Sequence, residues 1–203
     1  MAVTIHRLLA LGSALAACLT LAACKPTTET GKVETAPAPP SAPAAKPASP
    51  VTFSHDPALN AFGYYFTDSD VRLGNLKLSS LNIGEPSDFA DWEAGRRLST
   101  YAPVFLVFDD VTSPMAVGET GQAYHTVSLR VMPTAYKVDG QEVSFYGVDS
   151  KLGSMTFHGT FDLTTLSAAQ AAGEAGSKPV LRGDLQIGDR SFRDLSSLYY
   201  PGD

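Results

Sequence analysis

Short runs of alternating apolar and polar residues recur from about Val51 to the end of the chain, and this pattern constrains the fold most. Such alternation is typical of β-strands that bury one face. In residues 155–161 the odd positions are apolar or glycine and the even positions are polar. Residues 104–108 are apolar throughout, which predicts a strand covered on both faces. The chain is therefore expected to fold mainly as β-structure.

Two turn signals indicate that neighbouring strands pair antiparallel. Asp139-Gly140 and Gly188-Asp189 each separate two strand-like runs, and such dipeptides are typical of two-residue hairpin turns. The apolar positions change parity between Leu78 and Leu81, which predicts a bulge near Ser79-Ser80. These signals favour antiparallel pairing through much of the chain.

Two short helices are expected. Ser87 is expected to cap a helix that carries Phe89 and Trp92 on one face. A threonine at position 164 or 165 is expected to cap the second helix, which ends at Gly173. The sequence thus predicts an antiparallel β-sandwich or partly closed barrel with one or two short helices.

Residues 25–50 differ from the rest of the chain. They contain seven prolines, many alanines and threonines, and no aromatic residue. A segment of this composition buries too little apolar area to offset the entropy of ordering it, and its prolines favour an extended conformation of roughly 3.1 Å per residue. We therefore expect a tether over residues 24–50 and one globular domain over residues 51–203.

The N-terminal segment combines Arg7, an apolar run over residues 8–21 and two alanines before Cys24. The run is too short to span a bilayer but suits a signal peptide. Leu21-Ala22-Ala23-Cys24 resembles the lipobox of bacterial lipoproteins. The resemblance implies removal of residues 1–23 as a signal and acylation of Cys24, which anchors a protein without a transmembrane helix. It covers the signal and lipobox and does not extend to residues 51–203.

A second segment, Leu15-Ala16-Ala17-Cys18, shows the same pattern. Cleavage before Cys18 would leave an apolar segment at the new N-terminus, whereas cleavage before Cys24 is followed at once by the polar Lys25. We therefore prefer Cys24. In the proteobacterial lipoproteins that the signal resembles, Lys25 in place of aspartate implies sorting to the outer membrane, facing the periplasm.

Cysteine usage and charge exclude several classes of function. The two cysteines, Cys18 and Cys24, precede the domain, which therefore has no disulfide, thiolate metal site or cysteine nucleophile. Residues 51–203 contain 11 Lys and Arg against 19 Asp and Glu, a net charge of −8. This acidity argues against nucleic acid, whose phosphates require basic side chains. It also argues against the domain lying on anionic lipid headgroups.

Motifs for catalysis and cofactor binding are absent from the sequence. There is no His-Glu-x-x-His, Gly-x-Ser-x-Gly or Ser-x-x-Lys motif and no glycine pattern for phosphates or dinucleotides. The separations of His55, His125 and His158 do not indicate a metal site. We expect His158 to be exposed, His125 to border the core and His55 to lie in a loop. The sequence predicts no metal, no cofactor and no enzyme activity.

Two pairs of carboxylates are candidate cation sites. Asp109 and Asp110 follow the apolar run and precede Ser113-Pro114. Paired carboxylates at a strand end can bind a cation or act in acid–base chemistry, but aspartate and serine before proline also form turns, and we favour a turn. Asp68 and Asp70 begin a calcium-loop pattern without its later Gly and Glu, so a turn is expected there too.

Trp92, Arg96 and Arg97 lie within about one helical turn of one another and are the candidate partner-binding residues. Trp and Arg dominate the energetics of many protein interfaces. The alternative is that Trp92 anchors its helix in the core while both arginines are solvated. Tyr199 and Tyr200 form a second aromatic pair, which either covers a sheet edge or contacts a partner.

These observations favour a non-enzymatic lipoprotein that binds a protein of the envelope. One version is an inhibitor or immunity-type protein that blocks a cell-wall-degrading enzyme, since such enzymes are often basic and residues 51–203 are acidic. One alternative is a β-barrel carrier of a small apolar ligand, which requires a large closed apolar cavity. Another is a hydrolase that uses carboxylates such as Asp109 and Asp110, which requires a cleft joining them to other ionisable groups.

Overall fold

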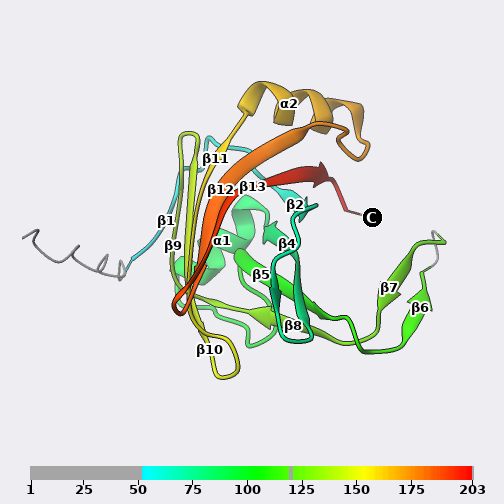
Figure 1. The fold of residues 1–203 in the computed structure, drawn as a ribbon. Coiled ribbons are helices and arrows are strands. Elements are labelled where there is room, and N and C mark those ends of the chain that lie inside the picture. Colours follow the sequence, from blue (N-terminus) through cyan, green and yellow to red (C-terminus); the bar gives the residue numbers. More distant parts are fainter. Residues whose placement is uncertain (1–51, 119–120, 203) are drawn as a thin grey trace, which may run out of the picture. The chain divides into compact units, whose positions relative to one another are not determined.

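The computed structural model describes residues 52–118 and 121–202. Within these ranges an eleven-stranded sheet curls into a half barrel, with one short helix inside the curl and a second across one end (Figure 1). The strands of this sheet are β1 (Phe53–His55), β2 (Gly63–Thr67), β3 (Arg72–Leu73), β4 (Leu76–Ile83), β5 (Val104–Asp110), β8 (Ser128–Val131), β9 (Pro133–Asp139), β10 (Glu142–Asp149), β11 (Gly153–Phe161), β12 (Pro179–Ile187) and β13 (Arg190–Tyr200). The inner helix is α1 (Pro86–Glu93), and the helix across the end is α2 (Leu163–Ala172). The prediction of a mainly β, partly closed barrel with short helices is confirmed.

The sheet has the order β1-β9-β10-β11-β12-β13-β2-β4-β5-β8, with β3 paired to β4. Every pair is antiparallel except β1 and β9, which run parallel with Phe53 opposite Tyr136. Strands β9 to β13 form a meander, and β13 then pairs with β2, Tyr199 opposite Tyr65. Strand β8 ends this path and β9 lies one strand from its other end, yet only Met132 separates them in the chain. The sheet must therefore curl back toward its own beginning.

The core lies inside the curl and follows from the alternation of the strands. The largest side chains with almost no exposed surface there include Tyr65, Phe108, Tyr136 and Phe145. In β11 the odd positions from Met155 to Phe161 are buried and His158 is exposed, as the sequence predicts. The predicted bulge is also confirmed, because the pairing of β4 with β5 shifts register between Leu78 and Ser80.

Gly159 of β11 and Gly183 of β12 lie directly opposite each other, and the Phe157 ring covers both. A Cβ atom on Gly183 would lie only 2.4 Å from the His158 carbonyl oxygen and 2.8 Å from the Gly159 Cα atom. The two strands therefore come closer at this point than any larger residue allows. This close approach explains why glycine occupies the position within a strand.

The two predicted hairpins are present. Gly188-Asp189 links β12 to β13 as expected, and Gly188 has a φ of +58° that favours glycine. In the other hairpin Asp139 pairs with Glu142, so the turn residues are Gly140-Gln141. The predicted turn at Asp139-Gly140 is therefore displaced by one residue.

Both predicted helices are present, but their N-caps differ from expectation. Glu85, not Ser87, is the N-cap of α1, because Pro86 occupies the first helical position. Asp162, not a threonine, is the N-cap of α2, which ends at Gly173 in a left-handed conformation as predicted.

Cys24, the signal over residues 1–23 and the tether over residues 24–50 lie outside the described residues. In the part of the chain that the structure describes, no helix has the length and apolar character needed to cross a membrane.

Candidate interaction sites

The predicted partner-binding residues lie at the C-terminal end of α1 and differ in their contacts. Trp92 is only 7% exposed, and its ring meets Phe53 of β1 edge-on with centroids 6.1 Å apart. The Arg97 guanidinium lies 4.4 Å from the centroid of the same Phe53 ring, and its Nε donates to the Trp92 carbonyl at 3.2 Å. Arg96 instead forms an exposed ion pair with Asp91. Trp92 and Arg97 thus hold α1 against β1, and Arg96 faces solvent.

A hollow of about 510 Å³ opens beside these residues, and Asp88, Leu98 and Tyr101 also line it. Tyr101 donates its hydroxyl proton to Asp88 Oδ2 at 2.9 Å, and burial together with this contact raises the pKa of Tyr101. The buried Nε1 of Trp92 has no acceptor among the described residues. A buried donor without an acceptor is costly.

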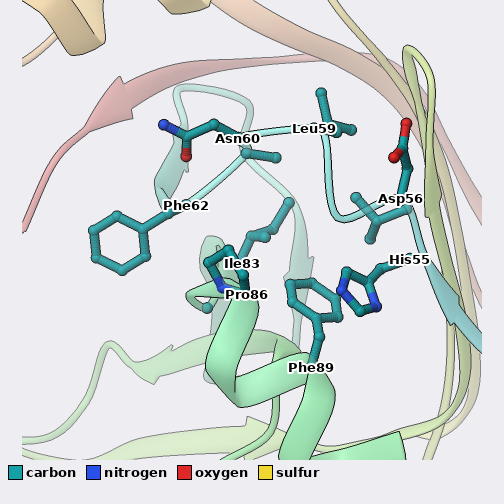
Figure 2. A pocket seen from close by; sticks show the side chains of 11 residues that line it. His55, Asp56, Leu59, Asn60, Phe62, Ile83, Pro86 and Phe89 are labelled. Carbon is teal, nitrogen blue, oxygen red and sulfur yellow. The ribbon is translucent and has the colours of Figure 1, made fainter.

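A much smaller hollow lies where β1 meets α1 (Figure 2). His55, expected in a loop, is the last residue of β1, and its ring stacks on that of Phe89 with centroids 4.4 Å apart. The space between them and the neighbouring Leu59 and Ile83 is about 10 Å³, which is room for about one water molecule. The carrier alternative requires a large closed apolar cavity, and this hollow is far too small for one.

Asp110 closes a turn at the end of β5. Its Oδ1 accepts hydrogen bonds from the Thr112 hydroxyl at 2.6 Å and the Thr112 N–H at 2.9 Å, and these hold the pKa of Asp110 below its usual value. The Ser113 hydroxyl donates to the Asp110 carbonyl at 2.7 Å. Asp109 remains within the strand, opposite Ser128. The turn interpretation therefore explains Asp110, and no cluster of three metal-ligating side chains occurs among the described residues.

Beyond this turn lies a hairpin that the sequence pattern did not reveal. It consists of β6 (Met115–Val117) and β7 (Ala123–His125), which pair with each other and form a sheet of their own. The chain therefore forms one long hairpin. Its inner half is the β5–β8 pair, which belongs to the main sheet, and its outer half is the β6–β7 pair, which does not. Figure 1 shows β6 and β7 projecting away from the half barrel. His125, expected to border the core, lies in this projection instead.

The hairpin exposes large apolar side chains. Met115 is 56% exposed, Val117 71%, Tyr124 52% and, just beyond β7, Val127 52%. Residues 113–118 and 121–127 include no Lys, Arg, Asp or Glu. Met115 and Val117 share one face of the ribbon, whereas Tyr124, opposite Ala116, lies on the other face. Exposed apolar side chains on a projecting element make the hairpin a candidate interaction site. The glycines on either side of its tip were the available sequence signal, but runs of three residues are too short to stand out.

The outer face of β10 to β13 carries a row of polar residues. Ser144, His158 and Asp184 lie opposite one another on adjacent strands. His158 Nδ1 lies 3.0 Å from the Ser144 hydroxyl and Nε2 lies 3.3 Å from the Tyr146 hydroxyl. Asp184 instead accepts from the Asp194 N–H at 2.9 Å. In a hydrolytic triad the carboxylate binds one imidazole nitrogen and serine the other. Here both nitrogens face hydroxyls, so the row does not have the bonding of a triad.

Comparison with known proteins adds no relative: no family model matches the chain, and neither a curated protein nor a solved structure matches it.

Proposed function

We propose that this chain is a non-enzymatic, lipid-anchored envelope protein that binds another protein through the β6–β7 hairpin. The observation that carries this proposal is the exposure of Met115, Val117 and Tyr124 on a ribbon outside the main sheet. A ribbon of two strands is marginally stable by itself, and these side chains contribute nothing to the main core. Their exposure is best explained by a partner that covers them.

The shape and charge of the surface favour one kind of partner. A projecting apolar ribbon fits a cleft or the edge of a sheet on another protein, and the lack of charged side chains among its described residues suits the desolvated centre of an interface. The net charge of −8 on residues 51–203 would steer a basic partner toward it. A basic cell-wall-degrading enzyme with an open substrate cleft meets both conditions, so the inhibitor or immunity-type role is the version we favour.

The proposed cellular location of the protein is inferred from its N-terminal residues. The lipobox-like segment ending at Cys24 supports anchoring by acyl chains, and Lys25 supports the outer membrane, facing the periplasm. A tether of the length of residues 24–50 would let the domain reach a partner away from the bilayer. In this proposal the protein contacts the membrane through the acyl chains on Cys24.

Trp92, Arg96 and Arg97 are the second contact we propose for the same partner. Arg96 is the member to test, because Arg97 also packs on Phe53 and Trp92 is buried. Arg96→Ala is expected to keep the fold and weaken binding.

Site-specific photo-crosslinking tests the hairpin directly. A photoreactive residue placed at Val117 or Tyr124 in the full chain is expected to give one discrete crosslinked product in intact cells, identified by mass spectrometry. Phe66 is the matched control, because it is 41% exposed on β2, in a different part of the molecule. The same product from position 66, or none from 117 and 124, would refute the hairpin as the interface.

A second experiment tests the kind of partner. The purified protein is expected to inhibit a purified lysozyme, a basic enzyme that cleaves cell-wall glycan. Val117→Ser combined with Tyr124→Ser should weaken inhibition at least about tenfold, while Phe66→Ser, at an exposed position on β2, should leave it unchanged. Inhibition that survives the double substitution would remove the hairpin from the interface. Absence of inhibition, with crosslinking to a different protein, would overturn the inhibitor version.

A further inference from the structure

We propose that the outer face of β10 to β13 binds a neutral oligosaccharide in a groove centred on His158 and Asp184. This site lies on other strands than the β6–β7 hairpin and does not depend on the function proposed above.

Two hollows meet at this place. One, of about 320 Å³, extends past Tyr146 and Gln186, and the other, of about 450 Å³, extends past Glu142 and Arg182. His158 and Asp184, a directly opposed pair on β11 and β12, line both hollows. The two therefore form one groove along the strands. The lining of β10 from Glu142 to Val148 corresponds to roughly 20 Å of extended chain, enough for several sugar units.

A bulge in β13 shapes the middle of the groove. The register between β12 and β13 shifts between Gly183 and Leu185, so that Arg193 and Asp194 both stand opposite Asp184. Asp194 is the one non-glycine residue with positive φ, +54°, among the described residues. Strained residues and bulges are concentrated at functional sites. Here the bulge brings the Arg193 guanidinium to 3.4 Å from the Asp184 carboxylate.

Asp184 and Arg193 can form more hydrogen bonds than the ones they form within the protein. The Asp184 carboxylate accepts one bond from the Asp194 N–H and one from Arg193, and a carboxylate has about four acceptor positions. A guanidinium has five N–H donors, and Arg193 uses one of them here. The Asp184 carboxylate can accept from one sugar hydroxyl while the Arg193 guanidinium donates to the next hydroxyl on the same ring.

Hydroxyl groups recur in the rest of the lining, which also includes apolar side chains such as Val148 and Phe192. Ser144 and Tyr146 hold His158 between them, and Thr156 lies beside it. Burial raises the pKa of Tyr146, so its hydroxyl stays neutral and both donates and accepts. A surface that alternates donors and acceptors complements the hydroxyls of a sugar.

The charges of the groove argue for a neutral ligand. Arg182 and Arg193 face Glu142, Asp184 and Asp194 across the two hollows. Two cations and three carboxylates nearly cancel, so a phosphate or another anion gains little there. A neutral chain of sugars suits this balance.

The test uses the purified full chain with three neutral probes: chitotetraose, cellotetraose and maltotetraose. Saturation-transfer NMR is expected to show saturable binding of at least one of them. His158→Ala and Asp184→Asn should each weaken that binding at least about tenfold. Asp184→Asn keeps an oxygen for the Asp194 N–H, so the bulge is preserved. Asp70→Asn is the matched control, because Asp70 is an exposed, ion-paired aspartate in the connection between β2 and β3.

Thr156→Trp is a second variant that fills the groove without removing a charge, and it should also abolish binding. Thermal melting of each variant shows whether its fold is intact. The proposal is overturned if no probe binds at about 10 mM, or if the folded groove variants bind as well as Asp70→Asn. Tighter binding of inorganic phosphate than of any sugar would also overturn it. Hairpin substitutions at Val117 and Tyr124 should leave sugar binding unchanged.

Discussion

Glu93 on α1 lies 2.9 Å from His55 on β1, measured from Oε1 to Nδ1. The same carboxylate oxygen accepts a hydrogen bond from the Tyr136 hydroxyl at 3.0 Å. One half-buried carboxylate thus joins the inner helix to the two parallel strands β1 and β9. Figure 2 shows the ring of His55 stacked on that of Phe89, which lies on the same helix as Glu93.

Glu93→Ala is expected to lower the free energy of unfolding by about 1–3 kcal/mol, because His55 and the Tyr136 hydroxyl both lose their acceptor. Urea denaturation measures the change. Asp91→Ala on the same helix is the control, since its ion pair with Arg96 is exposed, and it should change stability by at most about 0.5 kcal/mol. Equal losses in both variants would contradict the role of Glu93.

Gly183→Ala is expected to destabilise the sheet by about 1–3 kcal/mol, because the added Cβ would overlap the His158 carbonyl and the Gly159 Cα atom. Gly176→Ala serves as the control. Its Cβ would meet its nearest neighbour, the Tyr199 carbonyl oxygen, at an ordinary 3.5 Å. Chemical denaturation of the two variants should therefore separate them clearly, and similar midpoints would show that β11 and β12 can move apart.

The N-cap of α2 predicts a specific response to acid. Hydrogen bonds from the Thr165 N–H and hydroxyl hold the pKa of Asp162 below its ordinary value. A lowered folded-state pKa means that this carboxylate stabilises the fold above the unfolded value, about 3.9, and loses that effect as pH falls through the lower folded value. Asp162→Ala should thus melt below the wild type at neutral pH.

The melting difference between Asp162→Ala and the wild type should shrink below about pH 4. Glu174→Ala, an exposed carboxylate just beyond α2, should show no such pH-dependent difference. A gap that stays constant down to low pH would mean that the charge of Asp162 is not what stabilises the helix.

Buried tyrosines predict a limit at alkaline pH. Burial raises the pKa of Tyr65, Tyr136, Tyr146 and Tyr199. Groups with a raised folded-state pKa give their full stabilisation below the unfolded value, about 10 for tyrosine, and lose it as pH rises toward the folded value. Tyrosinate absorbance and circular dichroism followed together should show these rings ionising only as the sheet unfolds. Full ionisation with the sheet intact would contradict their burial.

The anchor is tested with the two cysteines as a matched pair. Cys24→Ser is expected to abolish incorporation of labelled palmitate and to release the protein from the membrane fraction. Cys18→Ser should leave both unchanged. The reverse result would move the lipid to Cys18, and labelling of both variants would reject the lipobox assignment.

Local patterns predicted most of the elements. The alternation in β11, the parity change in β4 and the Gly188-Asp189 turn depend on residues close in sequence, and all three are present. The N-cap of α1 was misplaced because glutamate is not among the residues preferred there. Pro86, which favours the first helical position, was the signal that pointed to Glu85.

Contacts between residues far apart in the chain could not be predicted from the sequence pattern. The parallel pairing of β1 with β9 joins residues about 80 positions apart, and no periodicity specifies such a partner. For the same reason no pattern in the sequence connects Ser144, His158 and Asp184, although they lie side by side on adjacent strands. Trp92 was correctly placed on an apolar helix face, but only the three-dimensional packing shows that Arg97 shares its contact with Phe53.

The pairing of β13 with β2 has a consequence for the order of folding. Thr67 donates to the Ser196 carbonyl across 129 residues of chain, whereas β9 to β13 are joined by short connections, the longest of which contains α2. Contacts between distant residues must overcome a larger loop-closure entropy and form slowly. We therefore expect β9 to β13 to pair with one another early and β2 to pair with β13 later. During that interval β13 presents an unpaired edge, so the interval before β2 docks is when a newly made chain is most exposed to aggregation.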